Sequence, residues 1–213
     1  MVDGLGGPPA IEELRSRGVR REEVIGLSSE IVWRVHATAG EHVLPWNFPR
    51  TWGPVLRFDH HPQPLGMHPE AGIWYGAANP RGALAEVFQE TRLIDRFHGT
   101  PYLTAARFTR KVRLLDVGGI GTGAWLTRAG GQFALDSAPH RIAQEWAQAI
   151  HEAYGEVEGI AYRGRFAGGP CVALFERGAE ALPDRPELSL PLSHPGLHAG
   201  VATAALELGY TVL

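Results

Sequence analysis

The stretch AGIWYGAANPRGALAEVFQE, residues 71–90, constrains the fold most strongly, because it predicts a strand, a tight turn and a helix in direct succession. The β-branched and aromatic residues at 73–75 suit a half-buried strand. Asn79 is a favoured N-cap, and Pro80 belongs at the first helical position, where its missing N–H costs nothing. The predicted helix then carries a single apolar stripe, formed by Ala83, Leu84, Val87 and Phe88.

Glu86 lies beside this apolar stripe rather than opposite it, on the shoulder of a face that should be buried. The strand that precedes the helix contains Tyr75, so a phenol and a carboxylate follow each other across the turn. Two interpretations remain open. Glu86 is either a charge that merely flanks the core, which the pattern by itself favours, or a carboxylate held at a functional site.

Composition describes an ordinary folded chain and argues against several function classes. Of the 213 residues, 44% are hydrophobic and 20% charged, which is enough to bury the core of one domain. The net charge of −3 argues against a nucleic-acid binder, because phosphate affinity comes from clustered Lys and Arg. Cys171 is the only cysteine, so no disulfide framework and no thiolate metal cluster is expected. Without a membrane-length apolar run or a signal-peptide pattern, we expect a cytoplasmic protein that makes no membrane contact.

The 27 Gly and 16 Pro imply many turns and favour a loop-rich α+β domain over a helical bundle. Residues 1–29 are expected to form a partly helical N-terminal extension, and residues 30–213 the main domain. The run GGIGTG at 118–123 fits neither common phosphate-loop pattern, so we expect a turn there. Periodicity predicts a strand at 30–38, two strands within 102–116, a helix at 137–154 capped by Ser137, a hairpin at 158–175, a helix at 197–208 and an edge strand at 210–213.

Residues 41–72 form a long, aromatic and Pro-rich connection, which is uncommon in a compact domain unless it has a function. The apolar run at 55–58 predicts a short strand with Arg57 embedded in it. A guanidinium between apolar neighbours is costly to bury unless it meets an anion, and that anion can be a carboxylate or a ligand phosphate. Arg34, in the first predicted strand, faces away from Trp33 and therefore points to solvent or to a cleft.

His60, His61 and His68, with Asp59 nearby, invite a metal-site interpretation. The two adjacent histidines would point to opposite sides of an extended strand, and no HExxH-like helical spacing is present. We therefore expect surface histidines in turns and no metal site. A metal-dependent hydrolase built on these histidines is a distant alternative.

Four segments, in this order, resemble the RES domain family of toxin–antitoxin systems: WRVHAT at 33–38, LRFDHHP at 56–62, GIWYGAANPRGALAEVFQE at 72–90 and GIAYRGRFAGGPCVALFE at 159–176. The resemblance covers residues 30–213, and its third segment is the most specific part. It implies an ADP-ribosyltransferase-like α+β fold with mixed, mostly antiparallel sheets and flanking helices. It also implies an enzyme that destroys NAD and is held in check by a partner antitoxin with an Xre-like DNA-binding domain.

The resemblance implies roles for individual residues. The Arg of the family corresponds to Arg57, with Arg34 matching a second Arg, and both are expected to hold the pyrophosphate of NAD. Tyr75 is expected to stack on or orient the nicotinamide half. Glu86 is expected to stabilise the positive charge that develops on the ribose. The implied catalytic residues are Glu86, Tyr75 and Arg57, and the implied NAD-binding residues are Arg34, Arg57, Tyr75, Arg163 and Gly164.

One position departs from the family, since Gly164 stands where relatives have Ser. A Ser hydroxyl can bond a ribose or phosphate oxygen, whereas Gly offers only its backbone N–H and space. Either Arg163 or Arg165 supplies the lost contact, or the site is weakened. The departure therefore bears on the rate and on activity itself.

The expected function is that of a NAD glycohydrolase-type toxin that cleaves the nicotinamide–ribose bond, with NAD as substrate and no metal. Two alternatives stay open: transfer of ADP-ribose to a protein target, and a degenerate NAD-binding module without turnover, which Gly164 motivates. The sequence does not choose among water, phosphate and a protein as the acceptor. It also leaves homo-oligomer formation open.

Overall fold

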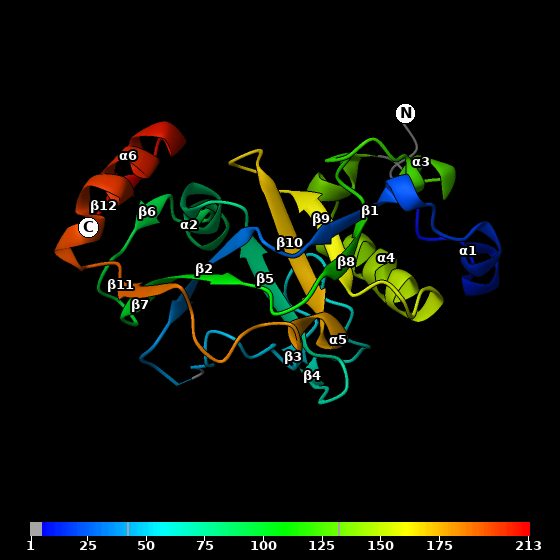
Figure 1. Ribbon diagram of the computed structural model, residues 1–213, viewed down its shortest axis with the longest axis horizontal. Coiled ribbons are helices and arrows are strands. Elements are labelled where there is room, and N and C mark those ends of the chain that lie inside the picture. Colours follow the sequence, from blue (N-terminus) through cyan, green and yellow to red (C-terminus); the bar gives the residue numbers. More distant parts are fainter. Residues whose placement is uncertain (1–5, 42, 132) are drawn as a thin grey trace.

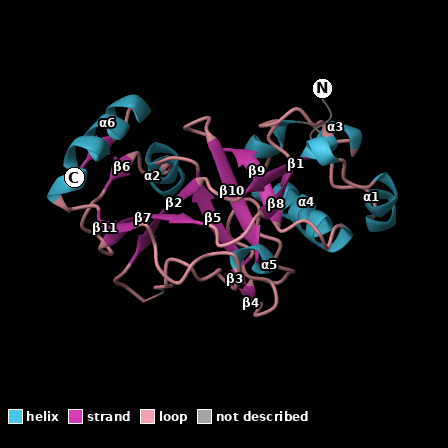
Figure 2. Ribbon diagram, viewed as in Figure 1, coloured by secondary structure: helices cyan, strands magenta, loops and turns pink. Residues whose placement is uncertain are grey.

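One eight-stranded sheet organises the molecule (Figures 1 and 2). The computed structural model describes residues 6–41, 43–131 and 133–213, and only the backbone of residues 133 and 134. The strand order is β1-β8-β9-β10-β5-β2-β7-β11, and all neighbouring strands are antiparallel except β8 and β9. In that order the strands span Val24–Leu27, Val112–Asp116, Gly159–Arg163, Pro170–Phe175, Ile73–Ala77, Ile31–Ala37, Pro101–Arg107 and Leu188–Pro191.

Helices flank the sheet at both ends of the molecule. Helices α2 and α6 lie together at one end, and α1, α3 and α4 lie at the other (Figure 1). From α1 to α6 the helices span Ile11–Arg17, Pro80–Phe88, Trp125–Arg128, His140–Ala153, Glu176–Ala179 and His198–Leu208. Two small sheets pair β3 (Trp52–Gly53) with β4 (Gly66–Met67) and β6 (Leu93–Ile94) with β12 (Thr211–Val212). The predicted α+β fold, with a mostly antiparallel sheet and flanking helices, is confirmed.

The strand–turn–helix segment forms as its residues predict. Strand β5 lies within the large sheet, and α2 begins directly after the turn, with Pro80 as its first residue. The side-chain oxygen of Asn79 accepts a hydrogen bond from the N–H of Gly82 at 2.8 Å, which caps the helix. The predicted stripe is only partly correct: Ala83 and Leu84 are buried and Phe88 is partly buried, but Val87 is 50% exposed. The buried face of α2 instead runs through residues 82–85, and Glu86 lies at its border.

The large sheet opens between β5 and β2. These strands are paired at a single register position, Trp33 opposite Ala77, whereas β2 pairs with β7 along its whole length. Beyond that position no ladder holds β2 against β5, and residues of both strands line a cavity. Arg34 from β2 and Tyr75 from β5 are among the lining residues. The opening in the sheet therefore brings together two of the predicted site residues.

Most of the other predicted elements are confirmed. The hairpin consists of β9 and β10, helix α6 ends before Gly209 in the left-handed conformation at φ 68°, and the last residues pair with β6. Residues 118–123 form a turn and carry no helix. The prediction that Ser137 caps α4 is wrong. Ser137 ends a separate 3₁₀ helix, Phe133–Ser137, and Pro139 takes the N-cap position.

The N-terminal segment contributes to the same core. Strand β1 is an edge strand of the large sheet, and Leu14 of α1 is fully buried against α4. The hydroxyl of Tyr154 donates a hydrogen bond to the Leu14 carbonyl at 2.6 Å. Arg128 of α3 forms an ion pair with the buried carboxylate of Glu23 at 2.6 Å. These contacts attach residues 11–27 to the end of the molecule that holds α4.

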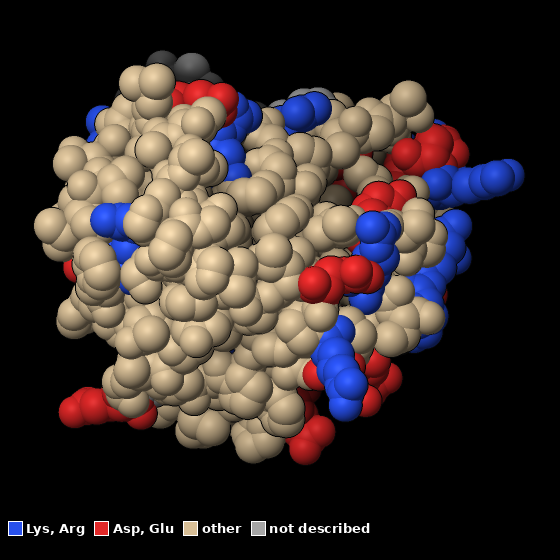
Figure 3. All heavy atoms as spheres, turned by 60° about the vertical axis from the view of Figure 1, so that its left-hand side comes forward, with Lys and Arg blue, Asp and Glu red and all other residues tan. Residues whose placement is uncertain are grey.

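Charge is mixed on the surface. On the face shown in Figure 3, the described basic and acidic side chains are interspersed around a broad uncharged area. Exposed large apolar side chains gather in the long connection: Val43, Phe48, Trp52, Val55, Leu56, Leu65 and Met67. Within the described parts of the chain, no helix is both long and apolar enough to cross a membrane.

Candidate active site

Two adjoining cavities bring together the residues that the sequence places at the site. One, of about 130 Å³, is lined by Arg57, Tyr75 and Glu86 among others. The second, of about 150 Å³, is lined by Arg34 together with the same Tyr75 and Glu86. Both cavities also share Leu56, Val87 and Tyr162. Glu86 and Tyr75 therefore stand where the two cavities meet, with one predicted Arg on each side.

Glu86 is held at this border by α2. Its Oε2 accepts a hydrogen bond from the hydroxyl of Tyr162 at 3.2 Å, whereas its Oε1 is buried and has no hydrogen-bond partner within the described parts of the chain. Burial raises the pKa of Glu86, opposed by the Tyr162 hydrogen bond, the charge of Arg57 and the nearby Arg165 amide. A buried carboxylate oxygen without a donor destabilises the fold, and a ligand that donates a hydrogen bond to it would remove this cost.

Tyr75 presents its ring rather than its hydroxyl to the cavities. The hydroxyl donates to Oδ1 of Asp59 at 2.9 Å and accepts from the Phe58 N–H at 3.1 Å. Burial and the Asp59 carboxylate raise the pKa of Tyr75 well above its usual value. Tyr75 therefore stays neutral, and a ligand can use its aromatic surface but not its proton.

Asp59 organises the segment that carries Arg57. Its side chain is fully buried and accepts hydrogen bonds from Arg50 at 2.7 Å to each oxygen and from the Leu56 N–H at 2.8 Å. Because the carboxylate also accepts the Val55 N–H, residues 55–58 fold into a turn, and the predicted strand there is wrong. The apolar run hid the turn, although an Asp at its end is a recognised turn signal.

Arg57 and Arg34 have no carboxylate within ion-pair distance among the residues that the structure describes. The Arg57 guanidinium donates to the Ala138 carbonyl, and its pKa is lowered by burial and by Arg165, with Glu86 among the groups that oppose the shift. Arg34 lies over the Trp74 ring at 5.2 Å. Burial and the neighbouring Arg50 lower the pKa of Arg34 to about 10. Both guanidinium groups therefore lack a protein anion.

The end of β9 and the turn after it bring two residues, Arg163 and Arg165, to the first cavity and place Gly164 beside Glu86. Arg163 lines that cavity, but its guanidinium donates to the carbonyls of Gly118 at 3.1 Å and Gly119 at 2.9 Å, which fixes that loop. Arg165 also lines the cavity. A Cβ on Gly164 would lie 3.0 Å from Glu86 Oε1, so the position that departs from the family stands directly beside the carboxylate.

Asp136 is a cavity residue that sequence reasoning missed. It lines the first cavity with Arg57 and Glu86, and its Oδ2 accepts the Arg163 N–H at 3.2 Å. Its Oδ1 is buried and has no hydrogen-bond partner among the residues that the structure describes, and burial raises the pKa of Asp136 to about 6. Its segment, GGQFALDSAP, carries no local motif that marks an acidic residue as part of a site.

The rings of His60, His61 and His68 lie side by side, with centroids 5.7 Å and 5.8 Å apart, but the three do not form a metal-binding group among the described residues. The expectation of surface positions is wrong for two of them. His60 and His61 are buried. His61 hydrogen-bonds the carbonyl of Arg50 at 3.1 Å, whereas His68 hydrogen-bonds the carbonyl of Pro64 at 3.0 Å. His60 instead faces residues from two other elements, described below.

Comparison with known proteins identifies the family. Residues 31–193 match the sequence pattern of a family described as RES domain. The chain is a member of the RES domain family. The resemblance stated from four short segments is thereby confirmed.

Similarity to individual proteins is lower. None of the curated proteins matches this RES domain protein. Its fold is similar to a chain in the crystal structure of the M. tuberculosis MbcT–MbcA toxin–antitoxin complex, with a TM-score of 0.56 and 12% sequence identity. The alignment covers 91% of this chain and 96% of that chain. At this identity the likeness establishes the fold.

The RES domain match contains the whole candidate site. Every residue that lines the two cavities lies between Trp33 and Arg165, inside the matched range. Helices α1 and α6 lie outside it. The cavities therefore belong to the part of the chain that the family shares.

Proposed function

We propose that this RES domain protein is a toxin that hydrolyses NAD at the nicotinamide–ribose bond. One observation carries the proposal. Arg34 and Arg57, which have no anionic partner among the described residues, line adjoining cavities that share Glu86. The Oε1 of Glu86 is buried and meets no donor in the described part of the chain. The cations can hold a dianionic pyrophosphate, and the carboxylate can face a developing cation.

Breaking the nicotinamide–ribose bond requires charge stabilisation more than a strong base. The bonding pair leaves with nicotinamide, which departs neutral, and positive charge develops on the ribose ring. The Glu86 carboxylate, beside that ring, stabilises the transition state more than the bound substrate, because the positive charge is present only in the transition state. Water then adds to the anomeric carbon and loses a proton, which gives ADP-ribose and nicotinamide.

The remaining residues hold the dinucleotide. Arg57 and Arg34 offer forked donors to phosphate oxygens on either side of Glu86. The Tyr75 ring can stack against the nicotinamide half, because its hydroxyl is occupied by Asp59. Arg165 can add a contact near Gly164, whereas Arg163 is already bonded to the loop at 118–119.

The partner follows from the same comparisons. The RES domain match and the fold shared with a chain of a toxin–antitoxin complex support a toxin that is neutralised by an antitoxin. We propose that this antitoxin carries an Xre-like DNA-binding domain and that the toxin acts on the NAD of the cytoplasm. Copurification of the chain with the product of a neighbouring gene, and loss of toxicity on coexpression, would test the pairing.

The decisive experiment measures nicotinamide release from NAD by the purified chain, free of any inhibitor. Glu86→Gln should lower the rate about a hundredfold or more, the usual effect of losing one electrostatic contact in a transition state. Glu90→Gln is the matched control, because Glu90 is exposed just beyond the same helix. A Glu86→Gln rate equal to that of the control would remove Glu86 from its role.

Stability separates this effect from unfolding. The folded-state pKa of Glu86 lies above its unfolded value, so the ionised form opposes folding at neutral pH. Glu86→Gln removes that charge and should leave the Tm unchanged or raise it. Label from NAD that ends on a macromolecule would instead indicate ADP-ribosyl transfer. NAD binding without nicotinamide release would indicate a binding module.

A further inference from the structure

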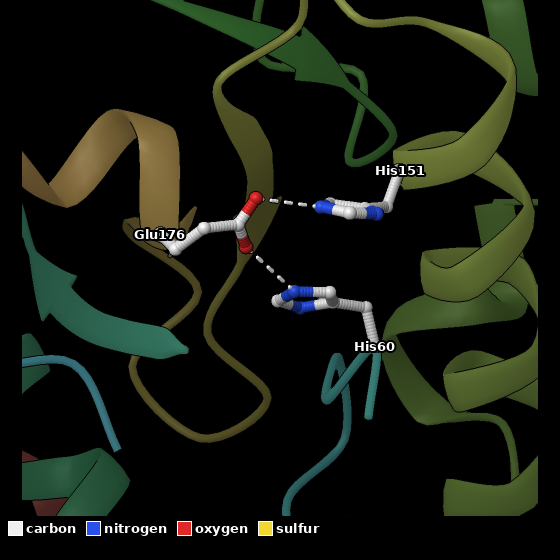
Figure 4. A group of neighbouring side chains, drawn as sticks. All are labelled: His60, His151 and Glu176. Carbon is white, nitrogen blue, oxygen red and sulfur yellow. Dashed lines mark hydrogen bonds and ion pairs between the residues drawn. The ribbon is translucent and has the colours of Figure 1, made fainter. Parts of the chain in front are cut away.

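A second cluster of chemically competent side chains lies outside the two cavities. His60 and His151 both point at Glu176 (Figure 4). Their Nε2 atoms lie 3.0 Å and 2.8 Å from the two carboxylate oxygens, respectively. One potential ligand atom from each residue lies within 4.8 Å of the others. None of the three residues lines either of the two cavities that contain Glu86.

The cluster is built from three separate elements that packing holds in place. His151 lies in the last turn of α4, Glu176 is the first residue of α5, and His60 follows the turn that carries Arg57. The imidazoles of His60 and His151 stack at 4.3 Å, and His60 packs against the Phe175 ring at 4.7 Å. The side chain of His60 is only 1% exposed. The donor atoms are therefore positioned before any ligand arrives.

Both histidines hydrogen-bond Glu176 through the Nε2 atoms that would bind a metal ion, so these hydrogen bonds are exchanged for metal bonds on binding. Burial tends to raise the pKa of Glu176, but hydrogen bonds from His151 and His60 outweigh it and hold the pKa well below its usual range. Burial lowers the pKa of His60, so its imidazole is neutral at neutral pH. Metal ligands must be an ionised carboxylate and neutral imidazoles. Nδ1 of His60 has no hydrogen-bond partner among the described residues. The ring proton can therefore move from Nε2 to Nδ1, which leaves the Nε2 lone pair for a metal ion.

We propose that His60, His151 and Glu176 bind a divalent transition-metal ion, for which Zn²⁺ is the representative. Two imidazole nitrogens and one carboxylate are a donor set that zinc accepts, with a fourth position for water. Tetrahedral zinc with bonds of about 2.0–2.1 Å places its donors about 3.3 Å apart. Here each Nε2 lies 3.0 or 2.8 Å from a different oxygen of Glu176, and one donor atom from each residue lies within 4.8 Å of the others, so the set has to contract around the ion. Binding requires the two imidazoles to turn their Nε2 lone pairs toward a common point.

A metal ion can reach the three residues from solvent, and one neighbouring cation, Arg177, opposes its binding. A surface cavity lined by His60, His151, Gln148 and Glu152 reaches the cluster from solvent. Arg177 lies 3.7 Å from Glu176 Oε1 and opposes a cation, but its guanidinium is held by backbone carbonyls at the end of α4. His60 directly follows Asp59, so a bound ion would brace the segment that positions Arg57. We therefore assign the site a structural role.

The test uses the full chain stripped of metal with a chelator and titrated with Zn²⁺ against a chromogenic chelator. Wild type should bind a single Zn²⁺ in this competition, and its Tm should rise. His151→Gln should weaken binding at least about tenfold and abolish the Tm shift, because it removes one of the ligands. His98→Gln is the matched control, since His98 is an exposed histidine outside the cluster, and it should bind as wild type does.

Two results overturn the proposal: failure of wild type to compete for Zn²⁺, and equal binding by His151→Gln and His98→Gln. Glu176→Gln is a second variant with the same expected loss, and it decides the matter should His151→Gln fail to fold. Neither readout uses NAD. The metal site and the proposed enzymatic function can therefore fail independently.

Discussion

Asp59→Asn tests whether one buried carboxylate holds the candidate site together. The fully buried side chain accepts hydrogen bonds from Arg50, from the Leu56 N–H and from the Tyr75 hydroxyl. Asn preserves the shape but removes the charge, and it turns one acceptor into an NH₂ group that faces donors. Arg50 then has no ionised partner at this position.

The structure sets the expected magnitude. Removing one partner of a buried ion pair costs about 3–5 kcal/mol. The Arg50 side chain is 20% exposed, so water compensates in part, and we expect a loss near the lower end, about 3 kcal/mol. In a protein of this size, each kcal/mol lowers the Tm by about 2–4 °C. Asp59→Asn should therefore lower the Tm by about 6–12 °C.

Thermal unfolding and nicotinamide release measure the two consequences. Below the lowered Tm, we expect the KM for NAD to rise, because the turn that presents Arg57 is less firmly held. Asp95→Asn is the matched control: Asp95 also accepts two backbone N–H groups, from Phe97 and His98, but it is partly exposed and has no ion-pair partner among the described residues, so the substitution should leave the Tm and the KM unchanged. Should Asp59→Asn show the Tm and KM of wild type, the reasoning about this network is refuted.

Gly164→Ser should keep or raise the rate of nicotinamide release, because it adds a hydroxyl beside Glu86. The added Cβ requires Glu86 and Cys171 to shift by a few tenths of an ångström. Complete loss of the rate would show that close approach of the backbone at Gly164 is essential. The kcat/KM should fall as pH decreases through the raised pKa of Glu86, because protonation removes the carboxylate; a flat profile down to pH values near 4.5 contradicts this. Asn79→Ala should destabilise the fold by about 1 kcal/mol in chemical denaturation, because the Gly82 N–H loses its cap, and an unchanged midpoint would contradict the capping role.

Local sequence signals were sufficient for the elements that carry Glu86 and Tyr75. The Asn79–Pro80 cap and the apolar stripe of α2 depend on residues within a few positions of one another, so they can be read without the fold. The same holds for the β9–β10 hairpin and for the stop of α6 at Gly209. Local pattern marked Arg57 and Arg34 as candidates without deciding their role, and the resemblance to the RES domain family supplied the expectation that both hold the pyrophosphate of NAD.

The turn at 55–58 shows where local reading fails. The apolar run there matches a strand pattern, but the segment forms a turn because the buried Asp59 carboxylate accepts hydrogen bonds from the N–H groups of residues 55 and 56. The same carboxylate also binds Arg50 and Tyr75, and these contacts form only in the folded protein. The same limit applies to Asp136, which reaches the cavity by packing against the β9–β10 turn. Their roles depend on partners that the adjacent sequence does not contain.

By itself, then, the sequence determined helices α1, α2, α4 and α6, most of the strands, the α+β class and the place of Glu86 at the border of a buried helix face, but not the short helices α3 and α5. Only the tertiary structure decided which side chains meet, such as His60 with Glu176, 116 positions apart. The physical reason is range. Capping and periodicity act over one or two turns of chain, whereas the pairing of buried charged groups is set by how the sheet and helices pack, which removes water and leaves each charge to find its partner in space.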